Sequence, residues 1–218
     1  MFDMDGVLVD SEPLYKIMNM DYFSELGINM DETEYNGYVG MSSQKMWSSI
    51  KSNYDLNESV SELMNSEKDR MYKTLSSDQI SEPIEGISEL INIFSAKGFK
   101  LSVASSSPAA NIRLVLDKLK LTGHFEFVIS GEEVENGKPS PDIFLRAAEF
   151  FNTHPKDCFV IEDSSNGVTA AKSAGMHCIG FRNSNSGEQK IDHSDIIVKS
   201  FSSSEIKKIL NYIEERIR

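Results

Sequence analysis

The sequence has few of the features that mark a secreted, membrane-spanning or disulfide-bonded protein. Only two cysteines occur among 218 residues, and Cys158 and Cys178 each lie in an apolar stretch, where a buried thiol is the usual state. No apolar run approaches the roughly 18 residues that a membrane-spanning helix needs, and no basic segment followed by an apolar stretch begins the sequence. We therefore expect a soluble, cytoplasmic protein that needs no disulfide to fold.

Positive charge is also scarce. Lys and Arg number 22 against 34 Asp and Glu, so the formal net charge is −12. Nucleic acids and anionic membranes are bound through Lys and Arg, so this balance argues against both as partners. A small anionic substrate would need local help, from a bound cation or from a lysine placed in the site.

From about residue 83 onward, amphipathic segments alternate with short apolar ones. Apolar residues recur at helical spacing in 86–98, 112–119, 142–151 and 168–174. The short apolar segments are 99–105, 126–130, 158–162, 177–181 and 195–198. Short apolar strands separated by helices predict a Rossmann-like, doubly wound parallel sheet with helices on both faces, which is an α/β core.

Residues 13–82 follow a different pattern. Three Met-rich segments with helical spacing occur at 14–27, 42–54 and 59–75, with polar turns and no convincing strand between them. We interpret this region as an all-helical insertion, or cap, and residues 1–12 and 83–218 as the α/β catalytic core.

The two crossings between core and cap each carry a proline. The residue before a proline is pushed toward extended geometry, so Glu12 before Pro13 and Glu82 before Pro83 are expected to be non-helical and to form a hinge. The polar segments 184–190 and 200–205 are interpreted as ordinary surface loops.

Ligands of an open parallel α/β sheet collect outside the carboxyl ends of its strands, so the residues that follow each strand are the candidates for a site. They are Asp3 and Asp5 near the N-terminus, Ser105, Ser106 and Ser107 after 99–105, Lys138 after 126–130, and Glu162 and Asp163 after 158–162. Only Met1 and Phe2 precede Asp3, and so short a strand would leave its neighbours partly unpaired. Whether the strand begins upstream of Met1 stays open.

Each candidate also has a simpler interpretation when it is considered alone. The Asp3-Met-Asp-Gly segment could be a turn or part of a calcium loop, and the three serines before Pro108 could cap a helix. Lys138 could be solvated, and Glu162 with Asp163 could cap the helix that follows. The combination of these groups at adjacent strand ends favours phosphate or metal chemistry.

Four segments in this order resemble the motifs of the haloacid dehalogenase-like superfamily: FDMDGVLVDSE (2–12), VASSSP (103–108), GKPSPDIF (137–144) and VIEDSSNGV (160–168). The helical insertion after the first motif is similar to the subfamily that holds beta-phosphoglucomutase and the sugar-phosphate phosphatases. The resemblance implies a Mg²⁺-dependent enzyme that acts on a small phosphorylated metabolite.

The resemblance also implies a role for each candidate. Asp3 would be the nucleophile that forms an aspartyl-phosphate, and Asp5, which points the same way two residues along a strand, would move protons. Ser105, Ser106, Ser107 and Lys138 would bind the phosphoryl group. Asp3, the main-chain carbonyl of Asp5, and Asp163 would hold Mg²⁺. Glu162 would contribute through a bound water or by contacting the residues that hold the ion.

The choice of reaction depends on the cap. Beta-phosphoglucomutases carry a histidine shortly after the first motif and an arginine in a glycine-rich cap loop, and Tyr15 and Ser43 (within 39–44) occupy those places here. A mutase must grip a second phosphate, for which arginine is the obvious group. We therefore expect a phosphatase of small phosphorylated metabolites such as sugar phosphates, with a sugar-phosphate mutase as the alternative and a non-catalytic metabolite-binding module as a third possibility. A monomer is expected, although the sequence does not decide between monomer and dimer.

Overall fold

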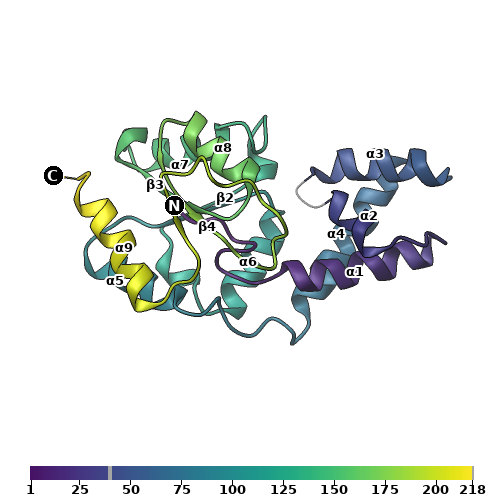
Figure 1. Cartoon of the computed structure of the whole chain (residues 1–218), viewed down its shortest axis with the longest axis horizontal. Helices are drawn as coiled ribbons and strands as arrows, with labels where there is room; N and C mark the ends of the chain where they lie inside the picture. Colours follow the sequence, from purple (N-terminus) through teal and green to yellow (C-terminus); the bar gives the residue numbers. More distant parts are fainter. Residues whose placement is uncertain (39–40, 218) are drawn as a thin grey trace.

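The computed structural model describes residues 1–38 and 41–217, which form an α/β part and a group of helices beside it (Figure 1). The strands are β1 (Ser102–Ser105), β2 (Phe127–Ser130), β3 (Phe159–Glu162), β4 (His177–Phe181) and β5 (Ile196–Val198). β1 pairs with β2, β3 with β4, and β4 with β5, and every pairing is parallel. The predicted parallel α/β core is confirmed.

The first residues of the chain join the two groups of strands. Phe2 forms parallel bridges to Val103 of β1 and to Ile161 of β3, and the Asp3 N–H donates to the carbonyl of Ile161 at 3.0 Å. The order across the sheet is therefore β2, β1, the N-terminal segment, β3, β4 and β5. Asp3 thus emerges from the middle of the sheet.

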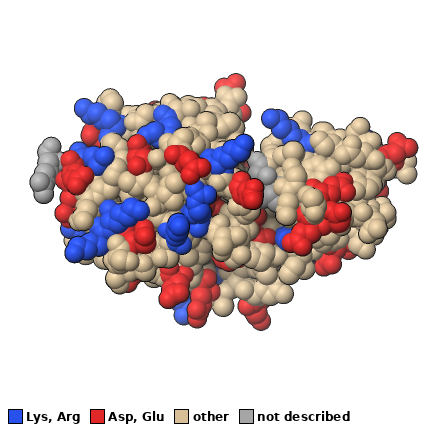
Figure 2. All heavy atoms as spheres, viewed as in Figure 1, with Lys and Arg blue, Asp and Glu red and all other residues tan. Residues whose placement is uncertain are grey.

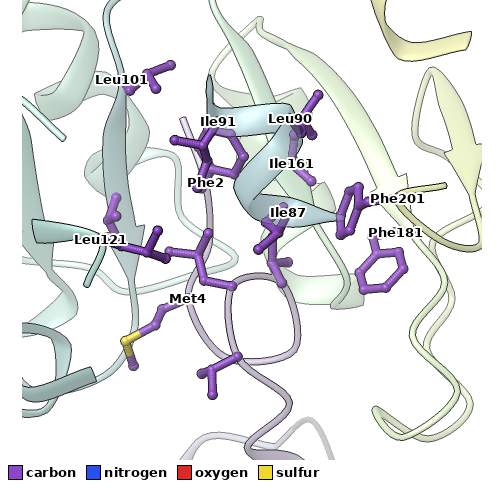
Figure 3. Packing of buried hydrophobic residues seen from close by; sticks show 14 of the residues in the cluster. Phe2, Met4, Ile87, Leu90, Ile91, Leu101, Leu121, Ile161, Phe181 and Phe201 are labelled. Carbon is purple, nitrogen blue, oxygen red and sulfur yellow. The ribbon is translucent and has the colours of Figure 1, made fainter. Parts of the chain in front are cut away.

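Helices cover both faces of this sheet. They are α5 (Ile87–Ala96), α6 (Ala109–Lys118), α7 (Asp142–Phe150), α8 (Ser165–Ser173) and α9 (Ser203–Glu214), with short 3₁₀ helices η1 (Thr122–His124), η2 (Gly131–Glu133) and η3 (Pro155–Asp157). Apolar residues of α5, α6 and α9 pack in one buried cluster and those of α7 and α8 in another. Figure 3 shows Phe2 and Met4 of the N-terminal segment within the first cluster, with Phe2 beside Ile91 of α5.

Four helices form a separate packed group at the right of Figure 1: α1 (Glu12–Glu25), α2 (Glu32–Tyr38), α3 (Ser43–Tyr54) and α4 (Val60–Ser76). Their shared apolar cluster includes Trp47 and Phe23 at its centre, and the Trp47 indole N–H donates to Glu67 Oε2 at 2.8 Å. Residues 39 and 40, in the predicted cap loop before Ser43, lie outside the described residues. On the face shown in Figure 2, acidic side chains gather over this group.

Three expectations about local structure were incomplete or wrong. Glu12 is not extended, because α1 begins there; Pro13 is tolerated in the first turn, where its missing N–H has no helical partner to lose. Segment 200–205 is only partly a loop, because α9 begins at Ser203 and buries Ile206 and Ile209. Helices α2 and α9 were not predicted. Among the described residues no helix is long and apolar enough to span a membrane.

Phe2 should be a strong determinant of stability. Its ring is 1% exposed and contacts Phe94 and Phe125, with ring centroids 6.1 and 5.8 Å away. Because truncation would leave a cavity in the middle of the sheet, we expect Phe2→Ala to lower the free energy of unfolding by about 3–5 kcal/mol in urea denaturation. Phe150→Ala removes the same side chain at a position that is 55% exposed and should cost much less. Equal losses would contradict this account of the core.

Candidate active site

The carboxyl ends of the N-terminal segment, β1 and β3 open onto one small cavity of about 150 Å³. Parallel strands place their carboxyl ends at the same edge of a sheet, so groups that are distant in sequence meet there. Six of the predicted residues line the cavity: Asp3, Asp5, Ser105, Ser106, Lys138 and Asp163. The structure therefore brings most of the predicted site together.

Lys138 lies beneath this cavity and is not solvated. Its side chain is 5% exposed, and its Nζ donates to Asp3 Oδ1 at 2.7 Å, to Glu162 Oε1 at 2.6 Å and to the Ala104 carbonyl at 3.0 Å. An ammonium group has three protons, so all of them are used. Burial alone would lower the pKa of Lys138, but the carboxylates of Asp3 and Glu162 raise it, and the group stays charged.

Three buried carboxylates face each other at the strand ends. Asp3, Glu162 and Asp163 each offer an oxygen within 4.8 Å of the others. Burial raises the pKa of the Asp3 carboxyl to about 8, with Lys138 opposing the rise and Glu162 adding to it. Burial also raises the pKa of Asp163, and the charges of Glu162 and Asp3 raise it further. When all three carboxylates are ionised, the cluster carries more negative charge than Lys138 neutralises. Its donors are all oxygens, and these residues fit a hard divalent cation.

Glu162 is the most enclosed member of this cluster. One oxygen accepts from Lys138, and the other accepts from the Ser164 N–H at 3.1 Å and the Ser164 hydroxyl at 3.0 Å. A Cβ on Gly167 would lie 1.8 Å from Glu162 Oε1, so helix α8 packs directly against the carboxylate. Both oxygens of Glu162 already accept hydrogen bonds from protein groups. This geometry favours an indirect role for Glu162 in cation binding, through its neighbours and not as a direct ligand. Ser164, not the acidic pair, caps α8 by accepting from the Gly167 N–H at 3.0 Å.

Asp5 lies where the helical group meets the sheet. Its Oδ1 accepts from Ser11 Oγ at 2.6 Å and from the Tyr15 hydroxyl at 3.0 Å, and its Oδ2 accepts from Ser107 Oγ at 2.6 Å. Burial, with the charge of Asp5 adding to it, raises the pKa of Tyr15, so this phenol stays protonated and donates. The carboxylate is therefore oriented by hydroxyl groups from both parts of the chain.

The three predicted serines occupy different places. Ser105 is buried at the cavity wall, where its hydroxyl accepts from the Ser107 N–H at 3.1 Å and still has a proton to donate. Ser106 is exposed at the rim, and Ser107 points to Asp5 instead of lining the cavity. None of them caps α6, because Pro108 holds the N-cap position without a side-chain bond. The interpretation of the three serines as a cap of α6 is therefore wrong.

Sequence reasoning did not single out four residues that line the cavity, which are Ser186, Gln189, Glu12 and Ser164. Ser186 and Gln189 belong to segment 184–190, so the interpretation of that segment as an ordinary surface loop was wrong. The signal was available, because the segment follows β4, which is the neighbour of β3, and its carboxyl end opens at the same edge. The third, Glu12, was named only within the first motif and as the residue before Pro13; burial raises its pKa to about 7, with Asp5 and Asp10 adding to the rise.

A larger cavity, of about 230 Å³, lies at the opposite end of the sheet. It opens beside the amino ends of β1 and β3 and is lined mainly by apolar and aromatic side chains, Phe94, Phe99 and Phe151 among them. None of the predicted site residues lines it. The smaller cavity, with its charged groups, is the candidate active site.

Comparison with known proteins identifies the family of the chain. A sequence model of the family described as "Haloacid dehalogenase-like hydrolase" matches residues 1–181, a range that contains every predicted site residue. The chain is 32% identical over 181 residues to the "Phosphorylated carbohydrates phosphatase" of Thermotoga maritima, covering 82% of each chain. It is also 32% identical over 186 residues to the "Beta-phosphoglucomutase" of Bacillus subtilis, covering 82% of this chain and 80% of that protein.

Among solved structures, the beta-phosphoglucomutase of Clostridium difficile superimposes with a TM-score of 0.80 at 24% identity, covering 99% of this chain and 96% of that one. At this level of identity the likeness is one of fold.

Gly6 should be required for the geometry of the site. Its φ is +76°, and a Cβ there would lie 2.0 Å from Asp163 Oδ2, so Gly6→Ala adds a collision to backbone strain. Gly27→Ala is a matched control, because Gly27 has φ +75° and nothing within 4 Å of the added Cβ. We expect Gly27→Ala to cost about 1–2 kcal/mol of stability and Gly6→Ala clearly more in thermal unfolding. Equal costs would argue against the close approach of Gly6 to Asp163.

Proposed function

The chain belongs to the haloacid dehalogenase-like hydrolases, and we propose that it is a Mg²⁺-dependent phosphatase of small phosphorylated metabolites, with sugar phosphates as the preferred class. The observation that carries this proposal is the position of Asp3 and Asp5 on one cavity, beside a buried lysine and an oxygen-only cluster of carboxylates. The similarity to a phosphatase of phosphorylated carbohydrates supports the substrate class.

Asp3 is the proposed nucleophile. Its carboxylate oxygen attacks phosphorus, the bond from phosphorus to the ester oxygen breaks, and an aspartyl-phosphate forms. Asp3, the main-chain carbonyl of Asp5, and Asp163 would hold the cation, which when bound reduces the repulsion between the Asp3 carboxylate and the phosphate. Lys138 keeps Asp3 oriented through its 2.7 Å ion pair and supplies a fixed positive charge beside the reacting group.

Asp5 is the proposed acid and base. In protonated form it gives its proton to the departing alkoxide, and it then takes a proton from the water that attacks the aspartyl-phosphate. A carboxylate has about four acceptor sites, and three hydroxyl groups use three of them in the structure, so one stays open for this proton. The Ser11, Tyr15 and Ser107 hydroxyls therefore orient Asp5 without blocking it.

The remaining predicted residues would bind the phosphoryl group. Ser105 has a hydroxyl proton to donate at the cavity wall, and Ser106 lies at the rim. Ser107 would contribute mainly through Asp5. The helical group α1–α4 is the proposed cap, and its closure over the cavity would exclude bulk water and select the substrate.

A mutase is the second candidate, because the chain is as similar to a beta-phosphoglucomutase as to the phosphatase. The described cap residues favour hydrolysis. Ser43 donates its hydroxyl to Glu67, Tyr15 donates to Asp5, and Lys45 is exposed. None of these three offers a guanidinium group for a second phosphate.

We further propose that the enzyme is monomeric and cytoplasmic. The cytoplasmic location is in keeping with two free and buried cysteines.

Release of inorganic phosphate tests the reaction. We expect a panel of sugar and polyol phosphates to release phosphate in the presence of Mg²⁺ and not in the presence of chelator. Asp3→Asn and Asp5→Asn should each lower turnover by about 10²-fold or more, because they remove the nucleophile and the proton carrier. Full turnover by Asp3→Asn would disprove the nucleophile assignment.

The same assay separates the alternatives. Conversion of beta-glucose 1-phosphate to glucose 6-phosphate, primed with a trace of the bisphosphate and without phosphate release, would favour the mutase. Tight binding of a sugar phosphate without any turnover in saturating Mg²⁺ would favour a metabolite-binding module.

Binding of Mg²⁺ should stabilise the protein more at high pH than at low pH. In the metal-free folded state the pKa of Asp3 is raised from the ordinary 3.8 to about 8, so between these pH values the folded protein holds a proton that the unfolded protein has lost. The stability of the metal-free protein therefore falls as the pH rises through this range. At about pH 5.5 protons compete with the cation, and at about pH 8 they do so much less. We therefore expect the rise in melting temperature on adding Mg²⁺ to chelator-treated protein to be larger at the higher pH. An equal rise at both would contradict the assignment of Asp3 as a ligand.

A further inference from the structure

The segment that follows β4, residues 183–189, forms one wall of the candidate active site, and we refer to it as the β4 loop. Ser186 of this loop is buried, with 4% of its surface exposed, and its hydroxyl donates to Asp163 Oδ2. The same residue borders Gly6, since a Cβ on Gly6 would lie 2.9 Å from Ser186 Oγ. The loop therefore contacts the acidic cluster through a specific polar side chain.

Gln189 links Ser186 to the start of α8. The Gln189 Nε2 group donates to the Ser186 carbonyl at 3.1 Å, and Gln189 Oε1 accepts from the Ser165 N–H at 3.0 Å. Ser165 is the first residue of α8 and lies two positions after Asp163. The loop is thus anchored to the same helix start that carries the acidic residue, which limits how far Ser186 can move relative to Asp163.

Two asparagines attach the loop to the N-terminal motif. Asn183 Nδ2 donates to the Gly6 carbonyl at 3.0 Å, and Asn185 Nδ2 donates to Asp10 Oδ2 at 2.6 Å. The β4 loop therefore connects both segments that carry the carboxylates of the site. These hydrogen bonds hold the β4 loop against the carboxylate cluster.

The bond from Ser186 matters because of the charge around Asp163. The Asp163 carboxylate is buried beside the carboxylates of Glu162 and Asp3, and its Oδ2 accepts the hydrogen bond from the Ser186 hydroxyl. A neutral donor can fix the plane of a carboxylate without adding a positive charge that would compete with a cation. Hydrogen bonds to a ligating carboxylate generally orient it and tune its affinity for the metal.

We propose that Ser186 is a positioning residue for the cation ligand Asp163, and that the β4 loop holds its hydroxyl in place for this purpose. The inference rests on the proposed function, because Asp163 is a cation ligand only within it. In this role Ser186 acts through its hydrogen bond to Asp163.

Cation affinity measured without substrate tests this role. Chelator-treated protein is titrated with Mn²⁺, an oxygen-preferring probe whose free concentration is read by electron paramagnetic resonance, and Mg²⁺ is then added as a competitor. We expect Ser186→Ala to weaken Mn²⁺ binding about 10- to 100-fold. Ser184→Ala is the matched control, because it removes the same hydroxyl from an exposed position of the same loop and should leave the affinity unchanged.

Gln189→Met is the second variant. It keeps the length of the side chain but removes the bond to the Ser186 carbonyl and the bond from the Ser165 N–H, so it should weaken Mn²⁺ binding in the same direction and by less. Melting temperatures without metal show whether each variant is folded; if Ser186→Ala is not, Gln189→Met decides the question. A purely structural role would lower the metal-free melting temperature and leave the affinity of the folded protein unchanged, which would overturn the proposal.

The outcomes separate this inference from the proposed function. Unchanged Mn²⁺ affinity in folded Ser186→Ala overturns the role of Ser186 alone. Absence of Mn²⁺ binding by the unsubstituted protein overturns the inference together with the metal dependence of the proposed function. Weakened binding in the variants, in a protein that releases no phosphate from any substrate, supports the inference and contradicts the phosphatase activity.

Discussion

The buried ion pairs that Lys138 makes with Asp3 and Glu162 connect three segments of the chain that meet only in the folded state. Burying these charges is costly, and their mutual attraction does not make such a cluster a strong source of stability. The single positive charge of Lys138 also does not balance the carboxylates when they are ionised, because Asp163 adds a third carboxylate to the same space. A divalent cation bound by oxygen ligands would balance this charge.

The parallel sheet is what allows this cluster to form. The N-terminal segment pairs with β1 on one side and with β3 on the other, although only two residues precede Asp3. Because all neighbouring strands run in the same direction, their ends deliver Asp3, Ser105 and Asp163 to one edge. The apolar residues around Phe2 and Met4 hold this segment in place (Figure 3).

Much of the α/β part could be predicted from periodicity, since each predicted strand from 99–105 onward overlaps an observed one. The predictions that failed depended on tertiary context. The carboxyl end of β4 could have been included by the same rule that identified Asp163, but its polar residues resemble those of any surface loop. Helix α9 begins within a serine-rich segment, where a run of small polar residues conceals the apolar face that follows it.

By itself, the sequence determined the alternation of strands and helices, the order of the four motifs and the residue types at the strand ends. These features are local, because helical and strand periods and the turns between them are written in consecutive residues. Only the tertiary structure decided that Ser107 bonds Asp5, that Lys138 is buried between two carboxylates, and that Ser186 reaches Asp163. Such partners are chosen by which distant segments become neighbours, and burial, which sets the pKa of Asp3, exists only after the whole chain has packed.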